Sequence, residues 1–237
     1  MSGKLNGRIA LVTGASRGIG RAVALRYAQE GAEVVAFART KGGLEELDDE
    51  IKKISGKNAV LVAESLTDFD KIDQVGAALH QRFGKLDILV GAAGALGQMS
   101  PMGHYTPKMW NNIFDINLHA NWRLIRAMDS LLRVSDAGRA IFVTSTVAVE
   151  PRMYWGPYAV SKAALEQMVR IYANEVGHTN VRANIVNPGG VRTKMRALAF
   201  PGEDPNTLPT PEQVTDVFVD LALASCTLSG ETVKAQP

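Results

Sequence analysis

Short runs of apolar, often β-branched residues alternate with longer stretches of helical spacing, and this alternation limits the fold more than any other feature. Six buried strands are predicted, at residues 9–13, 34–38, 59–63, 86–90, 140–144 and 181–186. The helical stretches between them cover residues 21–30, 44–54, 69–83, 107–133 and 157–176. Strands that alternate with helices form right-handed βαβ units, so we expect an α/β fold with one doubly wound parallel sheet and helices on both faces.

The ends of the predicted helices carry their own signals. Gly31 and Gly84 follow two of them, where a residue in the left-handed conformation often ends a helix. Thr106 and Pro107 open the fourth helix as its N-cap and its first helical residue. No linker, repeat or low-complexity tract interrupts the pattern. We therefore expect a single domain over residues 1–237.

Residues 195–211, referred to below as the substrate loop, break the alternation. Prolines at positions 201, 205, 209 and 211 prevent this segment from forming one regular helix. Irregular segments of this length in compact domains are usually lids or disordered, and both interpretations stay open from the sequence.

Charge, hydropathy and cysteine content exclude several classes of protein. The net charge is only +2 and the basic residues are scattered, so no nucleic-acid partner is expected. The chain begins without the apolar core of a secretion signal and has no stretch of about 18 apolar residues, so we expect a cytoplasmic protein with no membrane partner. One cysteine, Cys226, rules out an internal disulfide. The histidines are far apart and show no zinc-type spacing with cysteine, so no metal site is predicted.

A glycine-rich turn links the first predicted strand to the first helix. Glycines there let the backbone approach a pyrophosphate, and the helix N-terminus presents N–H groups to the anion. Three glycines in this position of a βαβ unit indicate a dinucleotide site, with a purely structural turn as the alternative. The residues expected to contact the cofactor at this turn are Gly14, Ser16, Arg17, Gly18, Ile19 and Gly20.

The residues after the second strand indicate which dinucleotide binds. An acidic residue there would accept from the ribose 2′-hydroxyl of NAD, but this chain has Ala38 followed by Arg39. Arg17 in the glycine turn adds a second guanidinium. Two arginines near one ribose suit a 2′-phosphate, so NADP(H) is favoured and NAD(H) is the second candidate.

Tyr158 and Lys162 are the predicted catalytic pair. Their spacing of four places a phenol and an ammonium on one helix face, where the cation is expected to lower the tyrosine pKa. Such a spacing is common on helix surfaces, but Pro157 starts the helix directly before the tyrosine, and Ser145 follows the fifth strand, where α/β sheets bind ligands. Asn117 is a poor residue for a helix interior, and it is interpreted either as a core-bonded amide or as support for a proton relay through Lys162.

With these residues the chain resembles the classical short-chain dehydrogenases/reductases over nearly its whole length. The resemblance is carried by Thr13-Gly14-x-x-x-Gly18-Ile19-Gly20, Asn117, Ser145, Tyr158-x-x-x-Lys162 and Asn187-Pro188-Gly189-Gly190-Val191-Arg192-Thr193. Ser145 precedes Tyr158 by the family's usual thirteen residues. Within the family, residues 187–205 and 235–237 are similar to the bacterial YciK-type oxidoreductases.

The resemblance implies a Rossmann fold with a seventh strand near the C-terminus, a Ser–Tyr–Lys–Asn tetrad, and a homodimer or homotetramer. It also implies that Lys162 binds the nicotinamide ribose. Further cofactor contacts implied in the same way are Ser65, Leu66, Ala92, Ala93, Gly94, Tyr158, Lys162, Pro188, Gly189, Val191 and Thr193.

Three positions depart from the family pattern. The usual Asn-Asn-Ala-Gly after the fourth strand is replaced by residues 91–94, Gly-Ala-Ala-Gly, so the asparagine amides that tie neighbouring strands are missing. Ser65 stands where the family usually has an acid that faces the adenine. The usual Asp-Gly-Gly ending is absent, and we expect the shorter tail to alter the substrate pocket or the subunit contact.

The residues together predict an NADPH-dependent carbonyl reductase, or an alcohol dehydrogenase in the reverse direction, with 3-oxoacyl-carrier-protein reductase as one form of it. Tyr158 is the expected general acid and Ser145 orients the oxygen. The expected substrate is an apolar ketone or acyl thioester. Its pocket is predicted to be lined by Ala95, Leu96, Val147, Met153, Trp155 and the substrate loop. A non-catalytic NADP-binding sensor or scaffold is the alternative. The sugar epimerase/dehydratase branch, which shares Tyr-x-x-x-Lys, is disfavoured because it normally carries a longer C-terminal substrate domain.

Overall fold

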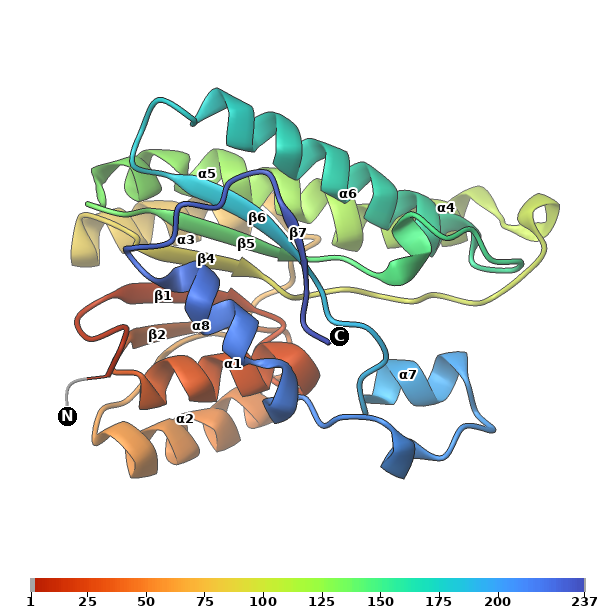
Figure 1. The fold of residues 1–237 in the computed structure, drawn as a ribbon, viewed down its shortest axis with the longest axis horizontal. Coiled ribbons are helices and arrows are strands. Elements are labelled where there is room, and N and C mark those ends of the chain that lie inside the picture. Colours follow the sequence, from red (N-terminus) through yellow and green to blue (C-terminus); the bar gives the residue numbers. More distant parts are fainter. Residues whose placement is uncertain (1–2, 237) are drawn as a thin grey trace.

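The computed structural model describes residues 3–236, which form a seven-stranded parallel sheet in the order β3-β2-β1-β4-β5-β6-β7 (Figure 1). The strands are β1 (Ile9–Thr13), β2 (Glu33–Phe37), β3 (Val60–Val62), β4 (Ile88–Gly91), β5 (Arg139–Val143), β6 (Arg182–Asn187) and β7 (Thr232–Lys234). The expected doubly wound α/β fold is confirmed, and the seventh strand implied by the family resemblance pairs with β6.

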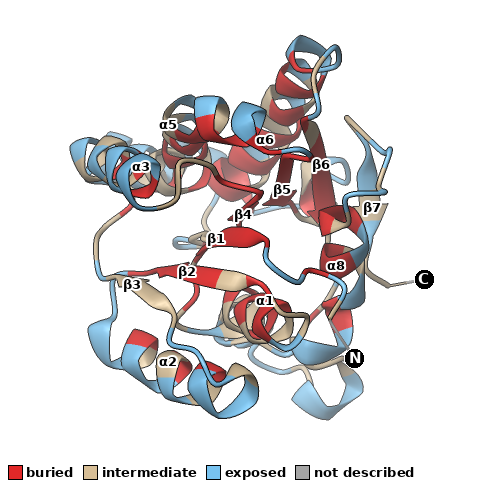
Figure 2. Ribbon diagram, turned by 90° about the vertical axis from the view of Figure 1, so that its left-hand side faces the viewer, coloured by how far each residue is buried: buried red, intermediate tan, exposed pale blue. Residues whose placement is uncertain are grey.

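Helices cover both faces of the sheet, with α3, α5 and α6 on one side and α1, α2 and α8 on the other (Figure 1). Their bounds are α1 (Gly18–Gln29), α2 (Lys41–Ser55), α3 (Phe69–Phe83), α4 (Pro107–Phe114), α5 (Ala120–Val134), α6 (Gly156–Glu175), α7 (Lys194–Ala199) and α8 (Asp216–Ala222). Buried residues concentrate on the central strands and on the helix surfaces that face them (Figure 2). No helix in the described part of the chain is long and apolar enough to span a bilayer.

The strand order reverses direction beside β1, whose neighbours are β2 on one side and β4 on the other. Chain crossovers to the two sides leave a crevice at the carboxyl ends of such strands, and ligands bind there in open α/β sheets. The turns that follow β1, β4, β5 and β6 all lie at this edge. The carboxyl edge is therefore the place where the sheet brings distant segments of the sequence together.

The predicted helix over residues 107–133 is interrupted. A π-helical turn over Asp115–His119 separates α4 from α5. Asn117 lies in this turn, and the side chain of Asn121 donates to its main-chain carbonyl at 2.8 Å. Polar side chains of this kind compete with regular helical hydrogen bonds, and π-turns often mark functional sites. The uninterrupted helix expected from spacing alone was wrong at this point.

The opposite, amino edge of the sheet is tied by buried polar side chains. Arg139, at the start of β5, donates to five main-chain carbonyls, three of them in the segment 223–226. Asp87, just before β4, accepts from Ser135 and from the main chain of Ile9. Burial disfavours the Asp87 carboxylate, but these bonds and Lys85 outweigh it and hold the pKa of Asp87 below its ordinary value. Arg8 extends the network to the main chain of Asp87.

Candidate active site

A cavity of about 740 Å³ opens at the carboxyl edge and continues from the glycine turn to Tyr158. It collects nearly all of the residues that the sequence singled out. Those lining it are Gly14, Ser16, Arg17, Gly18, Ile19, Gly20, Arg39, Ser65, Leu66, Ala92, Ala93, Gly94, Ser145, Tyr158, Lys162, Pro188, Gly189, Val191 and Thr193. Of the residues predicted to act in catalysis or to bind the cofactor, only Asn117 does not line the cavity, and its side chain is buried.

The glycine turn has the geometry that a close backbone approach requires. Gly14 and Gly18 adopt φ values of +69° and +58°, which are strained for other residues. A Cβ atom on Gly20 would lie 2.5 Å from the carbonyl oxygen of Gly14, so the helix could not start so close to the strand. Helix α1 begins at Gly18, three residues earlier than predicted, and its first N–H groups therefore face the cavity. The turn fits a dinucleotide pyrophosphate.

Arg17 and Arg39 lie at the outer end of the same cavity. Arg17 precedes α1 and Arg39 follows β2, and both side chains are exposed. No acidic residue stands at the β2 end, where the side chain before Arg39 is Ala38. This arrangement presents two guanidinium groups to the place where the adenosine ribose of a dinucleotide would lie.

Ser145, Tyr158 and Lys162 converge at the inner end. The Ser145 side chain lies beside the Tyr158 hydroxyl. The Lys162 ammonium lies 5.9 Å from the centre of the Tyr158 ring and donates to the Val143 carbonyl at 2.7 Å. Tyr158 and Lys162 are 8% and 3% exposed, so a surface ion pair, the common meaning of this spacing, does not describe them. Pro157 stands in the first turn of α6, as the sequence predicted.

The expected lowering of the Tyr158 pKa is wrong for the structure as it stands. Burial raises the pKa of the phenol above its ordinary value, and the neighbouring Ser145 side chain only partly opposes this shift. Burial also lowers the pKa of Lys162 to about 8. Because burial dominates both groups, the phenol is held in its protonated form at neutral pH.

The Asn117 side chain is fully buried and bonded to protein groups on both of its ends. Its Oδ1 accepts from the main-chain N–H of Ala95 at 2.8 Å, and its Nδ2 donates to the Ala95 carbonyl at 3.0 Å. The same Nδ2 lies 3.0 Å from the hydroxyl of Ser161 on α6. Of the two interpretations, these contacts match the core-bonded amide. Asn117 fixes the loop after β4 against the helix that carries Tyr158.

Aromatic and aliphatic side chains form the wall beside Tyr158. The ring of Trp155 lies 5.8 Å from that of Tyr158 and 5.7 Å from that of Phe200, measured between centroids. Ala95 and Leu96 line the cavity as expected. Two expected lining residues do not line it: Val147 is buried in the same apolar cluster as Trp155, and Met153 is 79% exposed. The turn before α6, in which Tyr154 has φ +72°, directs Met153 outward and Trp155 inward.

The substrate loop borders the opposite side of the cavity with Met195, Leu198, Ala199 and Pro211. Helix α7 makes its first part regular, and Thr193 caps that helix by accepting from the N–H of Arg196. Arg196 forms a bidentate pair with Glu203, with both contacts at 2.6 Å, and covers the Phe200 ring. The loop is thus closed on itself by a guanidinium, a carboxylate and an aromatic ring.

Residues 8–204 match the short chain dehydrogenase family. The chain belongs to this family. A curated relative, the oxidoreductase YciK of Escherichia coli K12, is 38% identical over 236 residues, which cover 98% of this chain and 93% of the relative. The YciK-type resemblance is confirmed.

Two solved structures of short chain dehydrogenases have the same fold at high similarity. One, from Shigella flexneri 2a, is complexed with NADP, and the other, from Escherichia coli CFT073, is complexed with NADPH. Each is 37% identical to this chain, has a TM-score of 0.96 and aligns over 100% of both chains.

The short chain dehydrogenase pattern after β4 is replaced here by a different set of bonds. Thr13, at the end of β1, accepts from the N–H groups of Ala92 and Ala93 at 3.1 and 3.2 Å. A Cβ atom on Gly91 would lie 2.4 Å from the Phe142 ring and 2.5 Å from Oδ1 of Asn121, so these two side chains occupy the space of the missing side chain. The Thr13 hydroxyl, from the glycine-turn motif, therefore holds the main chain of residues 92 and 93 in place of the missing asparagine amides.

The tail of this dehydrogenase supports the loop after β6. Gln236 donates to the carbonyls of Pro188 and Gly190 at 2.6 and 2.9 Å. The tail thus reaches the predicted nicotinamide end of the cavity.

Ser65 stands at the position where the family usually has an acid, and its hydroxyl bonds to Thr67 at 2.8 Å.

Proposed function

We propose that this short chain dehydrogenase is an NADPH-dependent carbonyl reductase, which acts as an alcohol dehydrogenase in the reverse direction. The observation that carries the proposal is one continuous cavity with Arg17 and Arg39 at one end and Ser145, Tyr158 and Lys162 at the other. The inner end is formed by residues of the family motifs, and the outer end by the two arginines beside the glycine turn and β2. A non-catalytic scaffold would have no use for a buried phenol beside a buried ammonium.

The cofactor is held by the glycine turn, the two arginines and the loop after β6. Gly14 and Gly20 leave room for the pyrophosphate, and Arg17 and Arg39 pair with a 2′-phosphate. Val191 and Thr193 contact the nicotinamide end, and Lys162 binds its ribose. The NADP and NADPH complexes of similar dehydrogenases support this choice over NAD(H).

The catalytic step needs a proton donor at the carbonyl oxygen. When bound, reduced nicotinamide supplies a hydride to the carbonyl carbon. Tyr158 donates its phenolic proton to the oxygen, and Ser145 holds that oxygen by a hydrogen bond. The Lys162 ammonium stabilises negative charge on the phenol as the proton leaves. Asn117 acts by holding Ala95, and through it the cavity wall, against α6.

The substrate is an apolar ketone or an acyl thioester, because the wall beside Tyr158 consists of Leu96, Trp155 and residues of the substrate loop. The substrate loop acts as its lid, closed by the Arg196–Glu203 pair. Initial rates of NADPH oxidation with aliphatic ketones, aromatic ketones and acetoacetyl thioesters test this proposal. Turnover of charged sugars alone, or of no carbonyl compound at all, would contradict it.

Carbonyl reduction is expected to decline as the pH rises through about 8. The Lys162 pKa is about 8, and loss of its proton removes the charge that stabilises the phenolate. The Tyr158 pKa is raised, so the phenol itself stays protonated over this range. Initial rates at saturating NADPH between pH 6 and pH 10 measure the decline. Lys162→Arg should remove it, because arginine keeps its charge, and a flat wild-type profile up to pH 10 would refute the assignment.

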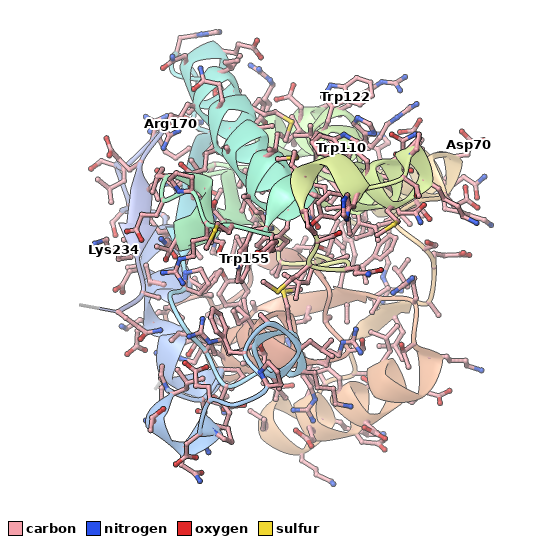
Figure 3. The ribbon with its side chains drawn as sticks, turned by 90° about the vertical axis from the view of Figure 1, so that its right-hand side faces the viewer. Asp70, Trp110, Trp122, Trp155, Arg170 and Lys234 are labelled. Carbon is pink, nitrogen blue, oxygen red and sulfur yellow. The ribbon has the colours of Figure 1, made fainter. Side chains whose placement is uncertain are left out.

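A second copy of the chain is proposed to cover the outer face of α5 and α6. A shallow groove there is lined by Leu118, His119, Trp122, Ala164, Gln167, Met168 and Ile171. Trp122 and Ile171 are 47% and 50% exposed, and Trp122 projects from the outer helices in Figure 3. An apolar face of this kind can pair with itself about a two-fold axis, as the homodimer implied by the family resemblance requires.

Ile171→Glu is expected to convert the dimer or tetramer into a smaller species, because it places a charge in the apolar contact. Light scattering after size exclusion gives the mass. Val134→Glu is the control, since Val134 is 65% exposed on α5 but outside the groove. A monomeric wild type, or an unchanged mass for Ile171→Glu, would exclude this interface.

A further inference from the structure

Three consecutive residues at the carboxyl end of β5 lie against three successive turns of α6. Val143 accepts from Lys162 through its carbonyl at 2.7 Å. Thr144 donates its hydroxyl to Glu166 at 2.8 Å. Ser145 follows and lines the cavity beside Tyr158. The proposed mechanism uses Lys162, Ser145 and Tyr158, but it assigns no role to Thr144 or Glu166.

Glu166 continues the line of the catalytic side chains along α6. Tyr158, Lys162 and Glu166 are spaced by four residues, so they share one face of the helix. All three are buried, and Glu166 is only 3% exposed. A buried carboxylate is costly unless its oxygens are bonded, and here each oxygen has a different partner.

The second partner of Glu166 is Arg170, one turn further along α6. Its guanidinium lies 2.8 Å from Oε2 of Glu166 and 2.9 Å from the Thr232 hydroxyl on β7. Figure 3 shows Arg170 on the side of α6 that faces β7, the last strand of the sheet. One carboxylate oxygen is thus fixed by Arg170, and the other is directed at Thr144.

We propose that Glu166 and Thr144 are positioning residues that fix Ser145 relative to Tyr158. This inference rests on the proposed function, because it concerns the geometry of the same reaction. The main-chain N–H of Thr144 is already held by the Val186 carbonyl at 2.9 Å. The Glu166 bond holds its side chain as well, so the chain direction into Ser145 is set from two sides.

Loss of the Thr144 hydroxyl leaves the residue before Ser145 without its link to α6. The Ser145 hydroxyl can then move relative to the phenol, and small displacements of a catalytic group cost large factors in rate. Thr144 borders the cavity, but its hydroxyl donates to Glu166, which does not line the cavity. The effect should therefore appear in turnover and not in cofactor binding.

Thr144→Val is the decisive variant, because valine has the shape of threonine without the hydroxyl. We expect kcat for an accepted carbonyl to fall on the order of tenfold, with the KM for the carbonyl and the Kd for NADPH nearly unchanged. Thr144→Ser keeps a hydroxyl and should restore most of the turnover. Rates are divided by the concentration of NADPH-binding sites, so partly unfolded protein does not imitate the effect.

Tyr172→Phe is the matched control. Tyr172 lies on the same helix, is buried, and donates to Asp129 on α5 at 2.8 Å. Loss of the Tyr172 hydroxyl removes a hydrogen bond between α6 and α5 without changing the contacts of residues 143–145, so kcat should stay at the wild-type value. A Thr144→Val/Glu166→Leu double variant should be hardly slower than the slower single variant, because each substitution removes the same Thr144–Glu166 hydrogen bond.

Wild-type kcat in folded Thr144→Val, or equal losses in Thr144→Val and Tyr172→Phe, would overturn the positioning role. Additive losses in the double variant would overturn it too. These results are distinguishable from failure of the proposed function, which would show as retained turnover when Tyr158 itself is replaced.

Discussion

Tyr158→Phe is expected to lower NADPH-dependent carbonyl reduction by roughly 10²- to 10⁴-fold, the usual contribution of a general acid. The substitution removes the hydroxyl that lies beside Ser145, and it leaves the ring that packs against Trp155. The cavity wall therefore stays in place, and NADPH binding should be nearly intact. Steady-state rates with the best carbonyl substrate and a fluorescence titration with NADPH measure the two properties separately.

Tyr154→Phe is the control for this experiment. Tyr154 is the nearest other tyrosine, it is 52% exposed, and the loop uses its main-chain carbonyl, which accepts from Tyr105. Its hydroxyl has no part in the proposed reaction, so turnover should not change. Retained turnover in Tyr158→Phe, with Tyr154→Phe equally active, would show that another group supplies the proton.

Arg39→Ala should weaken NADPH binding about tenfold or more while NADH binding changes little. A hydrogen bond to a charged group contributes about 1.5–3 kcal/mol, and about 1.4 kcal/mol corresponds to a factor of ten. The exposure of Arg39 places the expected effect toward the lower end of that range. Titration of the same preparation with both nucleotides gives the ratio directly, and the selectivity should also decline as salt is raised.

Lys41→Ala is the matched control for charge. Lys41 lies two residues beyond Arg39 at the start of α2, and its ammonium lies 3.6 Å from Glu45. It does not line the cavity, so neither nucleotide should bind more weakly. Equal losses for NADPH and NADH in Arg39→Ala would remove the argument for a 2′-phosphate at this position.

Much of the fold followed from local signals. The strands were predicted because β1 and β5 are buried over their full length and appear in the sequence as continuous apolar runs. Gly84 was predicted as a left-handed helix end and has φ +71°. The start of α1 was placed too late, because the first turn of that helix consists of the glycines themselves.

The remaining features depend on contacts between segments that are far apart in the sequence. The π-turn at Asn117 needs the main chain of Ala95, which lies 22 residues earlier. The bond between Thr144 and Glu166 joins the end of a strand to a helix across 22 residues. The inward direction of Trp155 depends on the left-handed conformation of Tyr154, which no local residue preference favours. Contacts between distant segments leave no repeating pattern in the sequence, so residue spacing alone does not predict them.

The carboxyl edge of the sheet carries the residues of the proposed reaction, and the amino edge carries the bonds that hold the strands together. Arg8, Asp87 and Arg139 join the strands at the amino edge, far along each strand from the loops that carry the chemistry. Among descendants of one gene, the loops at the carboxyl edge can therefore diverge toward new substrates without loosening the sheet. An inherited change at the amino edge would instead reduce the amount of folded protein in the cell, while each surviving molecule keeps its normal turnover.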